Sequence, residues 1–191
     1  MAKGFLLKDN LTKDTLLKIA GMGLLTAVVI TSPHFLHVVV KAYFKEKTRE
    51  MIRKRARKLW ELQKRKLIEF KEMADGSVKI TLTHLGKNLI RQYKLDEMTL
   101  PKHKQWDKKW RWLIYDIPNY KRKASLALSK KLHTLGLYKL QKSIWIFPYE
   151  IMPEIEFLCA VFEIDMNNWI HYFKTMEVPK EKEVKEFFNL K

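Results

Sequence analysis

One uncharged stretch of the sequence raises the question of whether this chain spans a membrane. Residues 19–40 form a run of 22 without an Asp, Glu, Lys or Arg, which is long enough to span a bilayer if all of it is one helix. Pro33 interrupts the run, because proline disfavours helix at the residue before it and favours helix after it. Acidic residues upstream of the run also argue against a signal peptide, because a signal peptide begins with a basic region. The pattern favours two soluble helices, over about 13–30 and 33–45. A membrane anchor is the alternative, and only the length of the uncharged run supports it.

The charge of the chain predicts an acidic partner. Lys and Arg outnumber Asp and Glu by 38 to 21, which gives a net charge of +17 and a pI near 9.8. Residues 41–66 hold 12 Lys or Arg against three Glu, and residues 101–143 hold 12 against two Asp. These blocks lie in different predicted structural units, so they form two patches on folded elements. Such patches attract polyanions, either nucleic acid or anionic lipid.

Composition excludes several other classes of protein. Apolar residues make up 47% of the 191, and Gly and Pro number six each, which excludes disordered, collagen-like and low-complexity chains. Cys159 is the single cysteine, so an internal disulfide framework and a cysteine-based zinc site are excluded. It lies in an apolar run, and we expect a buried thiol in a reducing cytoplasm.

A domain boundary is predicted near residues 96–108. This segment lacks periodicity and contains Pro101. We therefore divide the chain into a first domain over 1–96, a linker over 97–108 and a second domain over 109–191.

Residues 48–65 predict an amphipathic helix with a basic face. Its core-facing side groups four residues, with Trp60 beside them: Ile52, Ala56, Leu59 and Gln63. Its other side carries six cations near helical spacing: Arg49, Arg53, Lys54, Arg57, Lys58 and Lys64. A solvated face usually mixes signs, whereas only Glu50 and Glu61 oppose these cations. We expect them to contact nucleic-acid phosphates, with a plain solvated stripe as the alternative.

A β-hairpin is predicted directly after this helix. Residues 67–70 form a short strand, Asp75-Gly76 is a favoured hairpin turn, and residues 78–82 alternate as a half-buried returning strand. Thr83 can cap a last helix whose inner side carries Leu85, Leu89, Ile90 and Tyr93. The order of helix, helix, basic helix, hairpin and helix resembles a winged helix-turn-helix, and residues 80–87 resemble the "LTxxG" turn of bacterial regulators. That resemblance implies that the basic helix enters the major groove of duplex DNA.

The second domain predicts a ferredoxin-like fold. The expected elements are a strand over 110–117, a helix over 120–135 stopped by Gly136, strands over 137–141 and 143–147, a helix over 151–163, a strand over 169–176 and a helix over 180–188. The first six of these give the order βαββαβ, in which helices cover one face of an antiparallel sheet. The other face would need a partner, so we expect a homodimer. The whole chain is predicted to be of the α+β class, a winged helix followed by this domain.

Several separated motifs of the second domain resemble a known family. They are Ile114-Tyr115-Asp116-Ile117, Lys121-Arg122, Leu135-Gly136-Leu137 and Gln141-Lys142-Ser143-Ile144-Trp145. Their order and spacing resemble the "YDI…R…LG…Q-SVF" pattern of the small ferredoxin-like subunit of the CRISPR spacer-integration complex. With an N-terminal winged helix, the arrangement is similar to the phenylacetate-repressor (PaaX) group of transcription regulators, so that the two resemblances together cover nearly the whole chain.

The resemblance implies a candidate metal site at Asp116. In the CRISPR subunit the matching Asp is the proposed metal-binding nuclease residue, and it would hold Mg²⁺ against a phosphodiester across a dimer. Hard divalent ions usually need several oxygen ligands, and the three residues that follow Ile117 here are not acidic. We therefore favour a structural Asp116 that caps the next helix or pairs with Lys121 or Arg122.

These observations predict a cytoplasmic transcription regulator of the PaaX-like type that binds duplex DNA as a homodimer. No catalytic residue is favoured and no cofactor is required. The alternative is a metal-dependent nuclease or CRISPR-adaptation subunit that uses Asp116 and Mg²⁺.

Overall fold

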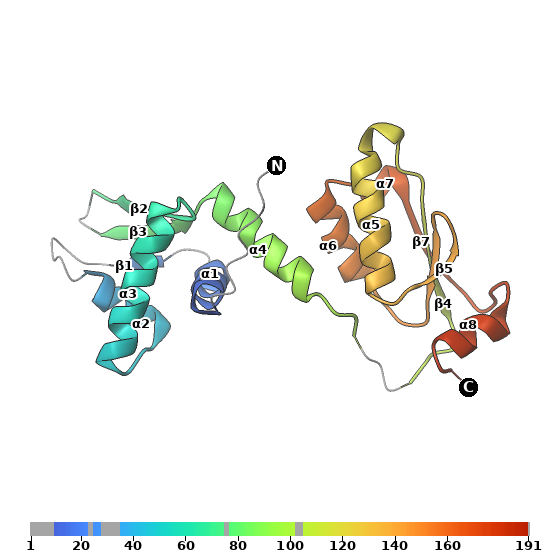
Figure 1. Cartoon of the computed structure of the whole chain (residues 1–191), viewed down its shortest axis with the longest axis horizontal. Helices are drawn as coiled ribbons and strands as arrows, with labels where there is room; N and C mark the ends of the chain where they lie inside the picture. Colours follow the sequence, from blue (N-terminus) through green and yellow to red (C-terminus); the bar gives the residue numbers. More distant parts are fainter. Residues whose placement is uncertain (1–9, 23–24, 28–34, 75–76, 102–104, 191) are drawn as a thin grey trace. The chain divides into compact units, whose positions relative to one another are not determined.

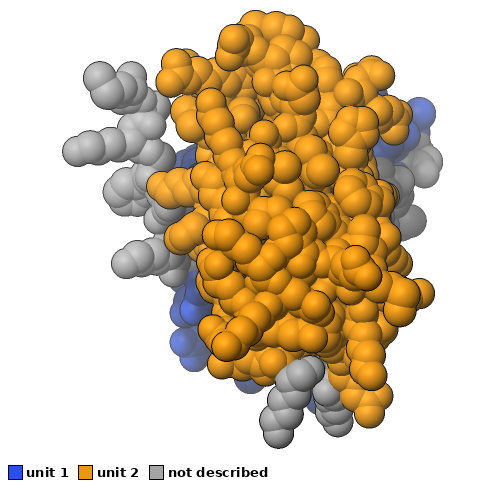
Figure 2. All heavy atoms as spheres, turned by 90° about the vertical axis from the view of Figure 1, so that its right-hand side faces the viewer, with its two compact units in different colours: residues 1–96 blue, residues 97–191 orange. Residues whose placement is uncertain are grey.

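The chain divides into two compact units, and the boundary between them in the sequence lies between Asp96 and Glu97 (Figure 1). The computed structural model describes residues 10–22, 25–27, 35–74, 77–101 and 105–190. Seen as space-filled atoms, the second unit is one closely packed body (Figure 2). Each unit is described by itself below.

The first unit combines four helices with a small sheet. Its elements are α1 (Asn10–Met22), β1 (Leu25–Ala27), α2 (Phe35–Phe44), α3 (Arg49–Lys64), β2 (Ile68–Glu72), β3 (Val78–Leu82) and α4 (His84–Glu97). The sheet is antiparallel, with strand order β1-β3-β2. Its core is built from apolar side chains of all four helices and the hairpin, among them Leu16, Val39, Leu59, Ile80 and Ile90.

The prediction of one helix over 13–30 is wrong at residues 25–27, and residues 23–24 and 28–30 lie outside the described part of the chain. The chain leaves α1 at Met22 and forms β1, whose residues Leu25 and Ala27 pair with Ile80 and Val78. Gly21 and Gly23 flank the end of the helix, where their low helix propensity favours termination. The second predicted helix is present as α2, and Pro33 itself lies outside the described residues. Within the described part of the chain, no helix is both long and apolar enough to cross a membrane.

The predicted hairpin forms directly after α3. β2 and β3 pair in register from Ile68↔Leu82 to Glu72↔Val78. The predicted turn at Asp75-Gly76 lies outside the described residues, and next to it the Met73 N–H donates to the Ser77 carbonyl at 2.8 Å.

Thr83 and Gly86 fasten α4 to the base of the hairpin. The Thr83 hydroxyl donates to the Lys66 carbonyl at 2.5 Å and accepts from the Gly86 N–H at 3.1 Å, which confirms the predicted N-cap. Gly86 is buried against β2, where a Cβ would lie 2.0 Å from the Leu67 carbonyl oxygen. The "LTxxG" segment therefore joins a helix cap to a close backbone approach that only glycine allows. Leu85, predicted to face the core, is instead 56% exposed.

The second unit has the element order predicted for it. Its elements are β4 (Trp110–Tyr115), the 3₁₀ turn η1 (Asn119–Lys121), α5 (Arg122–Thr134), β5 (Tyr138–Gln141), β6 (Ile144–Phe147), α6 (Met152–Phe162), α7 (Met166–Trp169), β7 (Ile170–Thr175) and α8 (Glu181–Phe187). The antiparallel sheet has strand order β5-β6-β4-β7, as in a ferredoxin-like fold. Gly136, with φ of +85°, follows the end of α5 as predicted.

The first strand of this sheet is held by Arg111. Arg111 is 7% exposed and donates to both carboxylate oxygens of Asp107, at 2.5 and 2.7 Å, and to the Pro148 carbonyl at 2.9 Å. Hydrogen bonds from Arg111 lower the pKa of Asp107 to about 2. Cys159 on α6 is buried as predicted, and burial raises its pKa to about 11.

The two faces of the sheet are covered unequally. Helices α5 and α6 lie on one side, and α8 lies on the other (Figure 1). Val184 of α8 packs with Trp110 and Ile146, both fully buried. The expectation that the second face lacks any cover within the chain is therefore wrong. Farther along that face Trp112 stacks on Phe173, and Phe173 is 42% exposed.

Gly86→Ala should destabilise the first unit, since the added methyl group must displace a backbone carbonyl. Overpacking of this kind costs about 1–3 kcal/mol, and a rigid carbonyl favours the upper end of that range. Gly21→Ala is the matched control, because a Cβ at Gly21 meets nothing within 4 Å and alanine favours helix. Urea unfolding followed by circular dichroism should show a loss for Gly86→Ala and none for Gly21→Ala. Equal stability of the two variants would contradict the close approach.

Candidate nucleic-acid interface

Helix α3 presents one face to the core and another to solvent. It begins after Thr48, whose hydroxyl accepts from the Met51 N–H at 3.3 Å. Its buried face consists of Ile52, Arg55, Ala56, Leu59 and Leu62. The sequence predicted most of this face, but Leu62 is buried there and Gln63 lies only at its edge.

Arg55 is the one cation of α3 that is turned inward. Its side chain is 4% exposed, and it donates to Asp14 of α1 at 2.7 Å and to Glu46, just after α2, at 2.6 Å. It also donates to the Thr15 hydroxyl at 3.0 Å and lies 4.8 Å above the centre of the Phe44 ring. These contacts fix the helix about its own axis relative to α1 and α2, which leaves its remaining cations on the outer side.

The charge of Arg55 is matched by these two carboxylates. Burial raises the pKa of Asp14, but hydrogen bonds from Arg55 and Lys18 outweigh burial, so the pKa lies below its usual 3.8. Asp14 therefore stays ionised as pH falls toward 4. The stabilisation is present above the ordinary pKa of the carboxyl and is lost as pH falls through its lowered value.

The outward cations form a stripe along α3. We define the α3 stripe as Arg49, Arg53, Arg57 and Lys64, all of which are exposed. At 100° per residue they fall within about 80° of the helix circumference. Each lacks a carboxylate partner in the part of the chain that the structure describes. Like charges gathered without counter-ions indicate a surface for a polyanion.

Lys54 and Lys58 lie beside the stripe and differ from each other. Lys54 is exposed, whereas the Lys58 side chain is 14% exposed and its ammonium lies 2.6 Å from Glu61. Both line a small cavity of about 210 Å³ together with Leu11, Arg57 and Glu61. The structure therefore keeps Lys54 available at the surface and places Lys58 in an intramolecular ion pair.

Trp60, predicted beside the core-facing residues, lies at the edge of the core on the outer side of α3. It is 47% exposed, and its ring meets Phe70 of β2 edge to face at 5.6 Å between centroids. Phe35 at the start of α2 completes the cluster, 6.3 Å from Trp60 and 5.7 Å from Phe70. On the helical wheel Trp60 falls between Arg49 and Arg53, a position that the sequence itself could have indicated.

The hairpin adds two cations that the sequence prediction did not include. Lys71 of β2 and Lys79 of β3 are directly opposed in the register. Like charges in opposed positions destabilise a sheet, unless an anion lies between or near them. Neither lysine has a carboxylate partner among the described side chains.

Asp116 lies at the end of β4, exposed to solvent. Its N–H donates to the Trp169 carbonyl at 3.0 Å, which ties β4 to α7. The predicted helix cap and the predicted pairing with Lys121 are not present, because η1 has no side-chain cap and Lys121 lies 3.7 Å from Glu163. Among the residues placed by the structure, no three His, Cys, Asp or Glu side chains gather as a metal site would require.

Asp116 instead borders a cavity that also contains Arg122, Lys139 and Lys142.

Comparison with known proteins places the second unit in a family. Residues 103–186 match the family model of the PaaX protein central Cas2-like domain. Fold and match together define the second unit as a Cas2-like domain of the α+β class. Within that class the second unit is similar to the central domain of PaaX proteins. No curated protein matches the chain significantly.

Replacing Arg55 should unfold the first unit far more readily than replacing a cation of the α3 stripe. Arg55→Met takes the cation away from Asp14 and Glu46, whose side chains are 42% and 16% exposed and can be hydrated in part, so the loss should be about 1.5–3 kcal/mol, the range for a hydrogen bond to a charged group. Arg53→Met is the matched control on the same helix, where an exposed substitution changes stability by about 0.5 kcal/mol or less. Chemical denaturation at pH 7 measures both.

The pH dependence provides a second readout for Arg55. The gap in stability between wild type and Arg55→Met should narrow as pH falls below 4, because protonation of Asp14 removes the charge that Arg55 pairs with. A gap that is small at pH 7, or that stays constant down to pH 2, would contradict the role given to this arginine.

Proposed function

We propose that this chain is a transcription regulator of the PaaX type that binds duplex DNA through α3 of its first unit. The observation that carries the proposal is the α3 stripe: four exposed cations that have no carboxylate partner among the residues the structure describes, on a helix held in place by a fifth, buried cation. The PaaX-type domain in the second unit supports the role in regulation.

The first unit would act as a winged helix. Its order of α1, β1, α2, α3, β2 and β3, with β1 closing a three-stranded sheet, supports this assignment. In this arrangement α2 and α3 form the helix-turn-helix and the β2–β3 hairpin is the wing. Lys71 and Lys79 of the hairpin would then contact the sugar-phosphate backbone beside the groove that α3 enters.

The dimensions of the stripe suit the major groove. Arg49 and Arg57 are eight residues apart, which is about 12 Å along a helix axis. This length is comparable to the width of the major groove, about 12 Å. Arginines at the two ends could therefore reach phosphates on both edges of the groove, while Arg53 between them faces base edges or a phosphate. Trp60 lies within the same outward sector and would add apolar contact with sugars or thymine methyl groups.

Neutralising two cations of the α3 stripe should weaken duplex binding in a salt-dependent way. Each phosphate contact contributes about 0.9 to the slope of log affinity against log salt, so Arg53→Ala/Arg57→Ala should lower the slope by close to two units if both touch phosphate. Fluorescence anisotropy with a labelled duplex over a range of salt concentrations gives the slope.

A control variant separates this effect from the loss of net charge. Lys87→Ala/Lys94→Ala removes the same charge from exposed positions of α4 in the same unit. It should change the slope little. Unchanged binding by Arg53→Ala/Arg57→Ala, or an equal loss in both variants, would reject α3 as the recognition helix.

The second unit would join two chains through the part of its sheet that α8 leaves open. There Trp112 and Phe173 stack, and the next pairs in the register place Ile114 opposite Ile144 and His171. An exposed aromatic surface of this kind is usually covered by another protein surface. A two-fold pair would carry two first units to two half-sites of one DNA site.

A charge placed on this surface should separate the chains. Phe173→Glu puts a carboxylate at a 42% exposed position, so it should leave folding nearly unchanged while it lowers the fraction of dimer in sedimentation. Leu126→Glu, 61% exposed on α5 and on the helix-covered side of the sheet, is the control that should stay dimeric. A monomeric wild type at micromolar concentration, or a Phe173→Glu variant that dimerises like wild type, would rule out this surface.

A further inference from the structure

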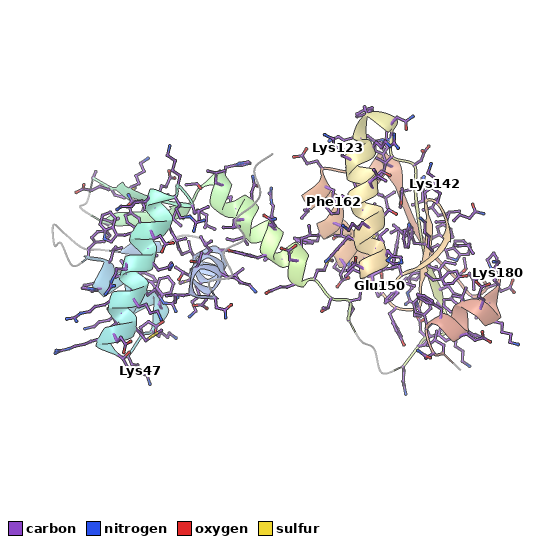
Figure 3. The ribbon with its side chains drawn as sticks, in the orientation of Figure 1. Lys47, Lys123, Lys142, Glu150, Phe162 and Lys180 are labelled. Atoms are coloured by element: carbon purple, nitrogen blue, oxygen red, sulfur yellow. The ribbon has the colours of Figure 1, made fainter. Side chains whose placement is uncertain are left out.

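The second unit contains a cavity that the proposed DNA-binding surface does not use. It measures about 590 Å³ and lies between the end of β4, the first half of α5 and the turn that joins β5 to β6. Figure 3 shows Lys142 of that turn at the end of the unit where α5 begins. The volume is within the range of about 300–1,000 Å³ that small-molecule sites occupy.

Three cations border this cavity from two directions. Arg122 comes from the first turn of α5, and Lys139 and Lys142 come from β5 and the following turn. None of the three has a carboxylate partner among the described residues, and Lys139 instead lies 5.4 Å above the ring of Trp145. Nearby cations of the same unit do have such partners, since Lys121 pairs with Glu163 and Lys174 with Glu150. The cavity therefore collects positive charge that the fold does not neutralise.

Hydroxyl groups and an apolar wall complete the lining. Ser125 and Ser129, both partly buried, lie one turn apart on α5, and Ser143 lies on the opposite side at the β5–β6 turn. Ile117 and Leu126 supply apolar surface. Cations and hydroxyls that converge on one concave space are the groups that proteins use to hold a phosphate, and apolar surface beside them accommodates an organic body.

The turn that carries Lys142 is fixed in position by β4. The Tyr115 N–H donates to the Ser143 carbonyl at 3.1 Å, and the Tyr115 hydroxyl accepts from the Trp145 indole N–H at 3.4 Å. The side of the cavity that carries Lys139 and Lys142 is thus held by the sheet before any ligand binds, which lowers the entropic cost of binding.

We propose that this cavity binds a small organic phosphate. The phosphoryl group lies among Arg122, Lys139 and Lys142, and hydrogen bonds from the serine hydroxyls complete its coordination. Asp116 at the border of the cavity accepts a hydrogen bond from a hydroxyl or amino group elsewhere on the ligand. This binding is independent of the DNA-binding role proposed for the first unit.

Two other occupants fit the lining less well. A divalent cation held by Asp116 would have to lie beside three unneutralised cations, which opposes its binding. A nucleic-acid backbone needs a basic track along a surface, whereas these cations converge on one concave space with an apolar wall. Both occupants are outcomes of the test below.

The test measures binding of inorganic phosphate, ribose 5-phosphate and ribose to the full chain at fixed ionic strength, by shifts of backbone amide signals in NMR spectra. We expect both phosphates to shift signals of residues around the cavity, ribose 5-phosphate to bind more tightly, and ribose alone to have no effect. Arg122→Ala/Lys142→Ala should weaken ribose 5-phosphate binding about tenfold or more, since it removes two charge-assisted contacts. Lys130→Ala/Lys182→Ala, exposed cations outside the cavity, is the control with the same change in charge and should bind like wild type.

Asp116→Asn distinguishes the anion site from a metal site by the sign of its effect. Removing a negative charge from an anion site should strengthen inorganic phosphate binding by about two- to fivefold. The proposal is overturned if neither phosphate shifts these signals at millimolar concentration, or if the control pair weakens binding as much as the cavity pair. It is also overturned if Mg²⁺ alone produces the shifts and Asp116→Asn abolishes them, or if a single-stranded oligonucleotide binds there and displaces ribose 5-phosphate.

Discussion

The arrangement of the first unit depends on the buried guanidinium of Arg55. Its partners come from α1 and from the connection between α2 and α3, so one side chain joins α3 to the segment just before it and to a helix about 40 residues earlier. A buried charge is tolerated only when it is paired, which means that α3 can lie in the core in one rotational setting. That setting turns Arg49, Arg53, Arg57 and Lys64 outward together. The outward position of the proposed DNA-binding face therefore follows from a structural contact on the opposite face of the helix.

The second unit, like the first, contains one buried arginine that is paired with a carboxylate and several exposed cations that are not. Arg111 is buried and bound by Asp107, and it fastens the first strand of the sheet to the segment before it and to the end of β6. Arg122, Lys139 and Lys142 carry their charges at the surface of a cavity without carboxylate partners among the described residues. Part of the excess charge of the chain thus lies in two separate places, a helix face in one unit and a cavity in the other.

Local patterns in the sequence predicted those elements whose partners lie close along the chain. The β2–β3 hairpin follows from alternation, and the element order of the second unit follows from strands and helices that end at Pro or Gly signals. β1 was missed because its three residues sit in an apolar run and pair with β3, more than 50 residues later. The packing of α8 on the sheet was missed for a related reason, since amphipathic spacing shows that a helix has an apolar side but not which surface covers it.

The candidate site was likewise predictable only where local spacing along the chain determines it. Helical spacing identified the basic face of α3, yet spacing alone could not separate Lys58, which pairs with Glu61, from Lys54, which stays exposed. Trp60 was predicted beside the core-facing residues of the helix, but spacing did not show that its side chain would be 47% exposed among the arginines. The cavity beside Asp116 required the fold, because its cations come from segments that meet only when β4, α5 and β5 are assembled.

The most direct test of this account is site-specific photo-crosslinking of the full chain to duplex DNA. A benzoylphenylalanine placed at Glu50, next to the stripe on α3, should form a covalent adduct with a labelled duplex, and high salt should suppress the adduct together with binding. The same photoreactive residue at Lys87 on α4 should form little or none. Efficient crosslinking from position 87 with none from position 50 would contradict the claim that α3 is the surface that meets DNA.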